Sequence, residues 1–379
     1  MKILIIRTYP SIMNIKNYNS QEIGLARAYI RAGHDCDIVY YAGNTKSYTE
    51  KIPADNGKEI TIHWLRSFSV FNNGFFFGLK KLIKQYDLLQ VSEYDQITSW
   101  WLYTFGKKPI YVYHGPYDSD ISKKHIIKCK IIDSLLLHKK NTAKTTVFTK
   151  SELATAGINK RNFGKVITIG VGLDTERFNE KNDSVSDFYC QLKSLKENEN
   201  VNYLLYIGVL EDRRNIKFLF ETFAEVCAKN AQTRLVMIGK GKPDYVKSCF
   251  DYADSLNITD KIIYVDALPQ NELKQIYEIC DVFVFPTKFE IFGMVLLEAM
   301  AFGMSVVSSH NGGSSTLIID DKYGTIVTDF DKTKWSEAIC AYLDDDDLRS
   351  SICKEASERI LNEFTWDKIA EKILNEFRF

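Results

Sequence analysis

The sequence predicts an α/β protein of two domains, each built on a parallel β-sheet. At 379 residues the chain is too long for one ordinary domain and suits two domains of roughly 150–200 residues each. The pattern strand, helix, strand occurs near the start, over residues 2–41, and again over residues 282–307. Because a helical crossover of this kind connects parallel strands, each half is expected to form a parallel sheet flanked by helices.

Composition argues against a membrane-spanning or disulfide-rich protein. The hydrophobic fraction of 45% is typical of a globular protein with full cores. No apolar run approaches the roughly 20 residues of a spanning helix, and residues 1–7 are too short for the core of a signal peptide. The eight cysteines are scattered without a C-x-x-C pair, as expected for reduced packing residues. A cytoplasmic location is therefore predicted.

The net charge of zero hides an asymmetry between the two halves. Residues 1–180 contain 26 of the 49 basic and 16 of the 49 acidic residues, and the remainder contains 23 and 33. An anionic membrane surface, or an acceptor that carries phosphate, is the natural partner of the basic half. The alternative is attraction between the two domains. We expect a protein peripheral at the inner face of the membrane, with no nucleic acid as partner.

The first domain is predicted to open with strand Lys2–Ile6, a polar loop over residues 8–19, a helix from near Asn19 and strand Cys36–Tyr41. Glu22, three residues after Asn19, fits a capping box. The loop would lie at the carboxyl end of a strand, where open α/β sheets bind ligands. It contains no G-x-G-x-x-G fingerprint, which disfavours a nicotinamide dehydrogenase.

His114 is a candidate functional residue of this domain. It directly follows the strand predicted at Pro109–Tyr113, and Gly115-Pro116 then reverse the chain, which aims the histidine outward. A purely structural histidine is the alternative. The other strands predicted here are Ile60–Leu65, Leu88–Val91, Thr145–Phe148 and Val166–Ile169.

Two segments of the first domain are candidates for a membrane surface. Residues 71–77 include three consecutive phenylalanines and are followed by Lys80, Lys81 and Lys84, which fits either a membrane contact or core packing. Residues 122–140 have the pattern of an amphipathic helix with a lysine-rich face. An ordinary solvated helix explains that pattern as well.

Residues 179–200 are rich in Asn, Ser, Asp, Glu and Lys and are predicted to be a linker. They divide a first domain of residues 1–178 from a second of residues 201–364. The second domain is expected to contain strands Tyr203–Ile207, Leu235–Ile238, Ile262–Val265, Val282–Phe285 and Ser305–Val307. A highly charged turn over residues 208–215 follows the first of these strands.

Two carboxylates frame the loop between strand Val282–Phe285 and a helix expected at residues 294–301. Glu290 precedes the helix and Glu298 lies inside it, so both can border one pocket. The backbone N–H groups of residues 292–294 have no acceptor within the helix and form a positive end suited to phosphate. An anionic ligand with hydroxyl groups, such as a nucleotide sugar, fits this chemistry. A buried βαβ unit with solvated glutamates is the alternative.

The run Glu290-x-Phe292-Gly293-x4-Glu298-Ala299-Met300-Ala301-x-Gly303-x-Ser305-Val306-Val307, followed by Gly312-Gly313, resembles a known signature. It is similar to the E-x7-E motif of family-four retaining glycosyltransferases with the GT-B fold. The resemblance extends over nearly the whole chain, more weakly in the first third. It implies two Rossmann-like domains facing across a cleft, with the acceptor in the first and the donor in the second. It also implies a last helix, 365–379, that returns to the first domain.

The resemblance implies a role for each matching residue. Glu290 would face the donor sugar, Glu298 the ribose, and His114 would sit beside the sugar. The turn Gly208-Val209-Leu210-Glu211-Asp212-Arg213-Arg214-Asn215 resembles the family's G-R-L-x-x-x-K-N/G phosphate clamp, with Arg214 in place of the lysine. The remaining candidates for donor binding are Gly208, Asn215, Gly239, Ala267 and Leu268 beside the base, and Phe292, Gly293 and Met294.

Three positions depart from the family pattern. Val209 replaces the arginine of the clamp, and Arg213 or Lys288 is expected to compensate. Thr316 stands where the family usually has an acidic residue. Tyr18, Asn19 and Ser20 occupy the loop where the family has a Gly-Gly pair that approaches phosphate or acceptor.

The function implied is transfer of a hexose from a UDP- or GDP-type sugar to a glycan or lipid-linked acceptor, in surface polysaccharide or glycan assembly. Retention at the anomeric carbon is expected, by a front-face mechanism, with neither a cofactor nor a metal required. Two alternatives remain open: a nucleotide-sugar epimerase of the same fold, and a non-catalytic partner of another transferase.

Overall fold

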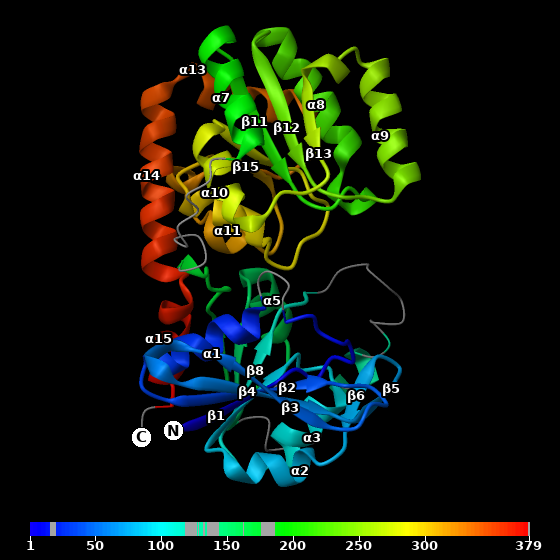
Figure 1. Cartoon of the computed structure of the whole chain (residues 1–379), viewed down its shortest axis with the longest axis vertical. Coiled ribbons are helices and arrows are strands. Elements are labelled where there is room, and N and C mark those ends of the chain that lie inside the picture. Colours follow the sequence, from blue (N-terminus) through cyan, green and yellow to red (C-terminus); the bar gives the residue numbers. More distant parts are fainter. Residues whose placement is uncertain are drawn as a thin grey trace. The chain divides into compact units, whose positions relative to one another are not determined.

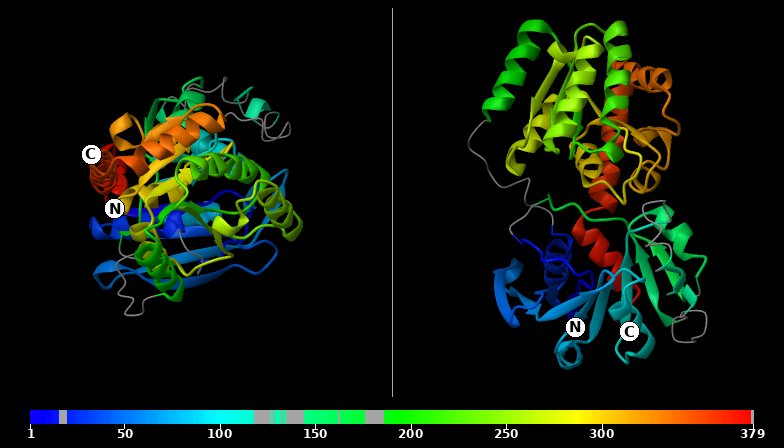
Figure 2. Two further views of the ribbon diagram at one scale, coloured as in Figure 1. Left: turned by 90° about the horizontal axis from the view of Figure 1, so that it is seen from above. Right: turned by 90° about the vertical axis from the view of Figure 1, so that its right-hand side faces the viewer.

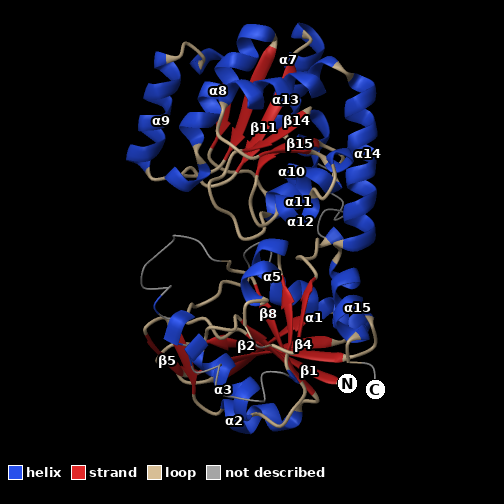
Figure 3. Ribbon diagram, turned by 180° about the vertical axis from the view of Figure 1, so that it is seen from behind, coloured by secondary structure: helices blue, strands red, loops and turns tan. Residues whose placement is uncertain are grey.

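The computed structural model describes residues 1–15, 20–117, 127, 129–131, 133–134, 144–161, 163–175 and 186–377. It divides into unit 1, Met1–Asp174 with Phe364–Phe379, and unit 2, Thr175–Glu363 (Figure 1). Each unit contains its own sheet with helices around it (Figure 3). The predicted α/β class with two Rossmann-like, parallel-sheet domains is confirmed.

The sheet of unit 1 has eight strands in the order β10-β9-β8-β7-β1-β2-β4-β3. Its strands are β1 Lys2–Ile6, β2 Asp35–Tyr41, β3 Tyr48–Pro53, β4 Glu59–Leu65, β7 Leu88–Ser92, β8 Ile110–His114, β9 Thr146–Thr149 and β10 Lys165–Thr168. Only β3 runs antiparallel, against β4. The chain winds away from β1 in both directions, so the switch point between β1 and β7 is where such a sheet binds ligands.

The first helix of unit 1 begins slightly later than the sequence predicted. Helix α1 spans Gln21–Arg31, and Ser20 is its N-cap residue without a capping side-chain bond. The predicted capping box is wrong in its use of Glu22, because that carboxylate accepts a hydrogen bond from Arg7 at 2.7 Å and does not cap the helix. Asn19 lies outside the described residues. The other helices of unit 1 are η1 Asp55–Gly57, α2 Leu79–Leu82, η2 Ile83–Gln85, α3 Ile97–Phe105, α5 Glu152–Ile158 and α15 Trp366–Asn375.

The Phe-rich segment forms an antiparallel ribbon that the sequence did not predict. Strand β5 covers Ser67–Val70 and strand β6 covers Asn73–Phe76, in a two-stranded sheet apart from the main one. Most of the amphipathic helix predicted at residues 122–140 lies outside the described residues. Within the described part of the chain, no helix is both long and apolar enough to cross a membrane.

The C-terminal helix α15 completes unit 1 by packing on α1 (Figure 2). Trp366, at the start of α15, is almost fully buried. A Cβ added to Gly24 on α1 or to Gly172 would overlap the Trp366 indole, so only glycine fits at either position. The backbone N–H of Leu173 also donates to the carbonyl of Phe364 at 2.6 Å. These contacts join residues 364–377 to unit 1 although they come last in the chain.

The sheet of unit 2 has six parallel strands in the order β13-β12-β11-β14-β15-β16. They are β11 Asn202–Ile207, β12 Thr233–Ile238, β13 Ile262–Val265, β14 Val282–Phe285, β15 Ser305–Ser309 and β16 Thr325–Val327. All four residues of β14 are fully buried, as expected for a strand covered on both faces. The switch point of this sheet lies between β11 and β14.

Helices lie on both faces of the unit 2 sheet (Figure 2). Right-handed crossovers put α8 and α9 on one face, with α13 against α8, and α10 and α11 on the other, with α7 against α10. The helices are α7 Asp187–Glu199, η4 Asp212–Arg214, α8 Ile216–Lys229, α9 Pro243–Ser255, η5 Thr259–Lys261, α10 Gln270–Ile279, α11 Met294–Ala301, α12 Ser314–Leu317, η6 Asp321–Tyr323, α13 Lys332–Asp344 and α14 Asp346–Glu363.

The predicted linker over residues 179–200 is wrong for most of its length. Residues 187–199 form helix α7 of unit 2, and residues 179–185 lie outside the described residues. Leu192 on α7 is fully buried, and the Lys196 ammonium donates at 2.8 Å both to Asp281 and to the carbonyl of Ile279. The polar composition that suggested a linker is the exposed face of this helix.

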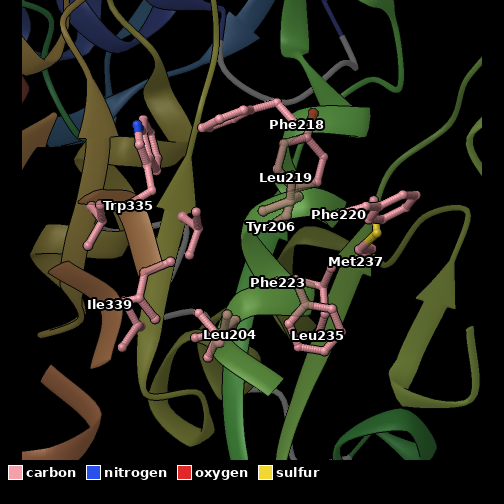
Figure 4. Packing of buried hydrophobic residues seen from close by; sticks show 14 of the residues in the cluster. Leu204, Tyr206, Phe218, Leu219, Phe220, Phe223, Leu235, Met237, Trp335 and Ile339 are labelled. Carbon is pink, nitrogen blue, oxygen red and sulfur yellow. The ribbon is translucent and has the colours of Figure 1, made fainter. Parts of the chain in front are cut away.

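The core of unit 2 fixes the strands whose ends carry the candidate site. Aromatic and aliphatic side chains of α8 pack between strands β11 and β12 and helix α13 (Figure 4). The cluster includes Leu204, Tyr206, Phe218, Leu219, Phe220, Phe223, Leu235, Met237, Trp335 and Ile339. Such close packing leaves these side chains and strands few low-energy arrangements. The loops after β11 and β14 therefore begin from fixed positions.

Candidate functional site

Two loops meet at the switch point of unit 2. One follows β11 and the other follows β14, and these strands are neighbours in the sheet. The carbonyl of Arg213 in the first loop accepts hydrogen bonds from the second, from the N–H of Lys288 at 2.8 Å and the hydroxyl of Thr287 at 3.2 Å. Arg213 Nη1 in turn donates to the carbonyl of Phe289 at 3.1 Å. The loops therefore hold each other in place.

The centre of this junction is an ion pair between Arg214 and Glu290. Arg214 Nη1 lies 2.5 Å from Glu290 Oε2, and their side chains are 12% and 15% exposed. The guanidinium also lies over the ring of Phe285, 5.4 Å from its centroid. Arg213 Nη1 is 3.4 Å from the same carboxylate oxygen. Two residues that the sequence singled out separately are thus in direct contact, with a second cation beside them.

The other residues of the charged turn occupy different positions. Val209 is 51% exposed, and its carbonyl accepts a hydrogen bond from Tyr206 at 3.2 Å. Lys288 lies 3.4 Å from Asp212 in a pair that is open to solvent. Of the two cations expected to compensate for Val209, Arg213 is therefore the one beside Glu290.

The predicted phosphate-binding N–H groups belong to the entry into α11. Gly293 has a φ of +76°, a left-handed conformation that glycine adopts readily. The N–H groups of Leu296 and Leu297 both donate to the carbonyl of Gly293, so those of Phe292, Gly293 and Met294 precede the first helical hydrogen bonds. They begin two residues after Glu290 in the chain and form the positive end of α11.

The double glycine after β15 supports the Glu290 loop. A Cβ on Gly312 would overlap the carbonyl oxygen of Ile291, and one on Gly313 would overlap that of Phe292. The N–H of Gly312 donates to the carbonyl of Glu290 at 3.0 Å. Thr316, where the family usually has an acidic residue, is buried and its hydroxyl donates to the Gly312 carbonyl at 3.0 Å. Here the threonine closes a turn.

Glu298 is buried inside α11, with an exposed fraction of 1%. The Tyr277 hydroxyl, on α10, donates to its Oε2 at 3.0 Å, and the Tyr277 ring stacks on Phe302 at 5.4 Å. The sequence did not identify Tyr277. It lies on the apolar face of a helix, and nothing in the local pattern distinguishes it from a core aromatic residue.

The remaining donor candidates lie along the same edge of the sheet. Gly208 and Gly239 follow β11 and β12, and a Cβ on Gly239 would overlap the carbonyl oxygen of Gly208. Asn215 has a φ of +59° and starts helix α8. Ala267 and Leu268 lie in the loop after β13, the former exposed and the latter half-buried.

His114 ends strand β8 in unit 1 and contacts Glu93, which the sequence did not identify. The imidazole is buried, and its Nδ1 lies 2.6 Å from Glu93 Oε2. Glu93 Oε2 also accepts the N–H of Gly115 at 3.1 Å. Burial by itself raises the pKa of Glu93, but His114 and Lys150 together lower it by more, so the net shift is downward. Glu93 has a φ of +56°, an unfavourable conformation for a residue other than glycine.

The position of Glu93 in the sequence is itself a signal. Glu93 is the first residue after β7, just as His114 ends β8, and both therefore lie at the carboxyl edge of the sheet. Arg7, the first residue after β1, has the same signal and pairs with Glu22. Burial raises and Arg7 lowers the pKa of Glu22, with a net decrease.

Of the three residues predicted for the loop after β1, only Ser20 is described. Its hydroxyl lies 2.9 Å from that of Tyr40 in a buried contact. Tyr18 and Asn19 lie outside the described residues. His114 and Ser20 belong to unit 1, whereas Glu290, Arg214 and the donor candidates all belong to unit 2.

Comparison with known proteins identifies several similar ones. Residues 190–359 match the family model described as glycosyl transferases group 1. An uncharacterized glycosyltransferase of Methanocaldococcus jannaschii is 24% identical, over 92% of this chain and 90% of that protein. The capsular polysaccharide biosynthesis glycosyltransferase CapM of Staphylococcus aureus is 26% identical, over 58% of this chain and 57% of CapM.

Solved structures of Anabaena HepE are also similar. The structure in complex with UDP superposes with a TM-score of 0.74, and the one with UDP-glucose with a TM-score of 0.67. Each is 15% identical and covers 100% of this chain and 99% of HepE. At this identity the likeness shows a common fold.

Proposed function

We propose that this chain, whose residues 190–359 match the family model of glycosyl transferases group 1 and whose fold is of the GT-B type, transfers a hexose from a nucleotide diphosphate sugar to an acceptor hydroxyl. The donor is of the UDP or GDP type, and the configuration at the anomeric carbon is retained. One observation carries the proposal. Arg214 and Glu290, which such a donor would engage through its diphosphate and its sugar, lie 2.5 Å apart at the switch point of unit 2.

The diphosphate of the donor would replace Glu290 as the partner of Arg214. A diphosphate offers more charge than a carboxylate, and the planar guanidinium of Arg214 can bind phosphate oxygens through two parallel N–H groups. Once the phosphates take those N–H groups, Glu290 is released to accept hydrogen bonds from sugar hydroxyls. Arg214 and the N–H groups of residues 292–294 then stabilise the charge that develops on the departing phosphate.

The nucleoside would lie along the same sheet edge. Glu298 accepts hydrogen bonds from the ribose hydroxyls in this proposal, and Tyr277 orients the carboxylate through the 3.0 Å hydrogen bond. Backbone groups of Ala267 and Leu268 contact the base. Gly208 and Gly239 carry no side chain, so the diphosphate can approach their backbones closely; a Cβ on Gly239 would overlap the Gly208 carbonyl oxygen.

The proposed reaction needs no nucleophile from the protein. The bond between the anomeric carbon and the phosphate oxygen breaks as the acceptor oxygen bonds on the same face, and the departing phosphate takes the acceptor's proton. His114 contacts the donor sugar, with its ring oriented by Glu93. Arg214 and the end of α11 supply the positive charge that a metal supplies in other enzymes. We therefore expect turnover in the presence of a metal chelator, without a cofactor.

The acceptor is proposed to be a glycan or a lipid-linked sugar in surface polysaccharide or glycan assembly. The similarity to CapM, a capsular polysaccharide biosynthesis glycosyltransferase, supports this role. The structures of HepE with UDP and UDP-glucose support a donor of the UDP type.

A two-step experiment tests the proposal. Thermal unfolding is first measured with a panel of UDP- and GDP-sugars, because a ligand at 100 times its dissociation constant stabilises a protein by about 2.7 kcal/mol. Release of nucleotide diphosphate is then measured with each stabilising donor, with and without EDTA. Binding followed by release supports the transferase. Conversion of the bound sugar without release indicates an epimerase, and absence of both indicates a non-catalytic partner.

A further inference from the structure

The ribbon of β5 and β6 presents an apolar face to solvent. Its register pairs Phe68 with Phe75, and their rings stack at 5.0 Å. Val70 and Phe77 are two residues further along their segments and share this face, since side chains alternate along a strand. Phe68, Val70 and Phe77 are all exposed. On the opposite face, Phe76 packs against the core of unit 1.

The tip of the ribbon holds a large aromatic residue in an unfavourable conformation. Phe71 is 91% exposed, and it has a φ of +48°, next to Asn72 at +59°. Bulky residues rarely adopt left-handed conformations. The tip is nevertheless anchored: Asn73 donates through Nδ2 to the Phe71 carbonyl at 3.0 Å and accepts through Oδ1 from the N–H of Ile97 on α3 at 3.0 Å. The protein thus displays Phe71 in a fixed position where it makes little contact.

Basic residues flank the ribbon in the sequence, and one of them, Arg66, lies over a ring of the apolar face. Arg66 precedes β5, and its guanidinium lies 5.5 Å from the centre of one of the exposed rings. Lys80, Lys81 and Lys84 follow β6 on α2 and η2, and all three are exposed. From Arg66 to Lys84 the sequence contains no acidic residue.

We propose that this docking ribbon, residues 66–84, binds the surface of an anionic lipid bilayer. Aromatic side chains enter the boundary between headgroups and acyl chains, while lysine and arginine pair with lipid phosphates. A second copy of this chain is a poorer partner, because a two-fold contact through the ribbon would bring its cations close to their own equivalents. The docking ribbon is separate from the residues proposed for sugar transfer, so the two proposals can fail independently.

The first test replaces Phe71 in the full-length protein by asparagine. Asparagine tolerates a positive φ, so Phe71→Asn should unfold at the same or a higher temperature while losing the apolar ring. Sedimentation with vesicles of phosphatidylcholine and phosphatidylglycerol at low salt should show binding weakened about tenfold or more. Ile319→Asn is the matched control, since Ile319 is 60% exposed in unit 2, and it should bind like the parent.

The second test removes the charge. The triple variant Lys80→Ala, Lys81→Ala, Lys84→Ala should lose roughly fivefold in affinity per lysine, and the parent should bind less as the Debye length falls to ~8 Å near 0.15 M salt. Binding of Phe71→Asn at the parental level would overturn the proposal, as would equal partition onto pure phosphatidylcholine. If the substitutions leave vesicle binding unchanged and alter only the molecular mass measured by light scattering, a second copy of the chain is the partner. Nucleotide diphosphate release from a soluble donor should be unchanged in both variants.

Discussion

Replacement of Arg214 by alanine separates a catalytic from a structural role of the ion pair. Arg214→Ala removes one preorganised cation from the departing diphosphate, and loss of one such donor typically lowers turnover by ~10²–10³-fold. Arg214→Lys should recover only part of this, since a point charge cannot reproduce the bidentate fork. Because Val209 stands where the family that this turn resembles has a second cation, Val209→Arg should partly restore turnover to Arg214→Ala. The assay is release of nucleotide diphosphate from the best donor.

The same change also has a cost in stability that the structure allows us to estimate. Removal of one partner from a fully buried pair costs ~3–5 kcal/mol. Arg214 and Glu290 keep 12% and 15% exposure, and Arg213 remains 3.4 Å from the carboxylate. We therefore expect a smaller loss of about 1–3 kcal/mol. At ~2–4 °C per kcal/mol for a domain of this size, the melting temperature should fall by several degrees.

A double variant distinguishes the two effects. Arg214→Ala with Glu290→Gln removes the uncompensated carboxylate, so much of the lost stability should return while turnover stays low. If Arg214→Ala turns over like the parent, the assignment of the clamp is wrong. If the double variant regains turnover together with stability, the ion pair is structural and the catalytic reasoning fails.

Three further predictions concern other parts of the molecule. Glu298→Gln should weaken binding of the best nucleotide sugar, measured by calorimetry, with little change in thermal unfolding; unchanged affinity would exclude contact with the ribose. Trp366→Ala should lower the free energy of unfolding, measured in urea, by about 3–5 kcal/mol. A decrease of less than about 1 kcal/mol would mean that α15 is not part of the unit 1 core. The pKa of Glu22 is lowered in the folded protein. Its pairing with Arg7 therefore contributes stability at pH values above the pKa of the unfolded chain, which is near 4.3. This stability is lost as the pH falls through the pKa of the folded protein. Urea unfolding of Glu22→Gln should therefore depend less on pH below 5 than that of the parent, and an equal dependence would contradict the ion pair.

The strands of both sheets follow from local sequence because burial on two faces demands continuous apolar runs. Val282–Phe285 is such a run, and its predicted and observed bounds agree. The ribbon of β5 and β6 could not be found in this way. Its apolar face points to solvent, so its pattern is the reverse of the one that a packed strand produces. Helix α7 was missed for a related reason, since Leu192 is its one buried side chain among 13 residues.

The candidate site was predictable in its parts and not in its pairings. Glu290 and Arg214 were identified from motifs 76 positions apart, but their contact depends on β11 and β14 being neighbours, which no local pattern states. Glu93 was missed because it has no periodic signal; its position is defined only by the end of β7 beside His114. Tyr277 reaches Glu298 from a different helix. Contacts of this kind arise from the fold and become visible only once the strand order is known.

Analysis by NMR of the sugar released from an α-linked UDP- or GDP-hexose tests the central claim most directly. Water can replace the unknown acceptor in a slow reaction, and the anomer that forms first reports the stereochemistry. We predict that nucleotide diphosphate and the α-anomer appear together in the presence of EDTA, and that Arg214→Ala loses both. First appearance of the β-anomer, or full activity of Arg214→Ala, would contradict the account.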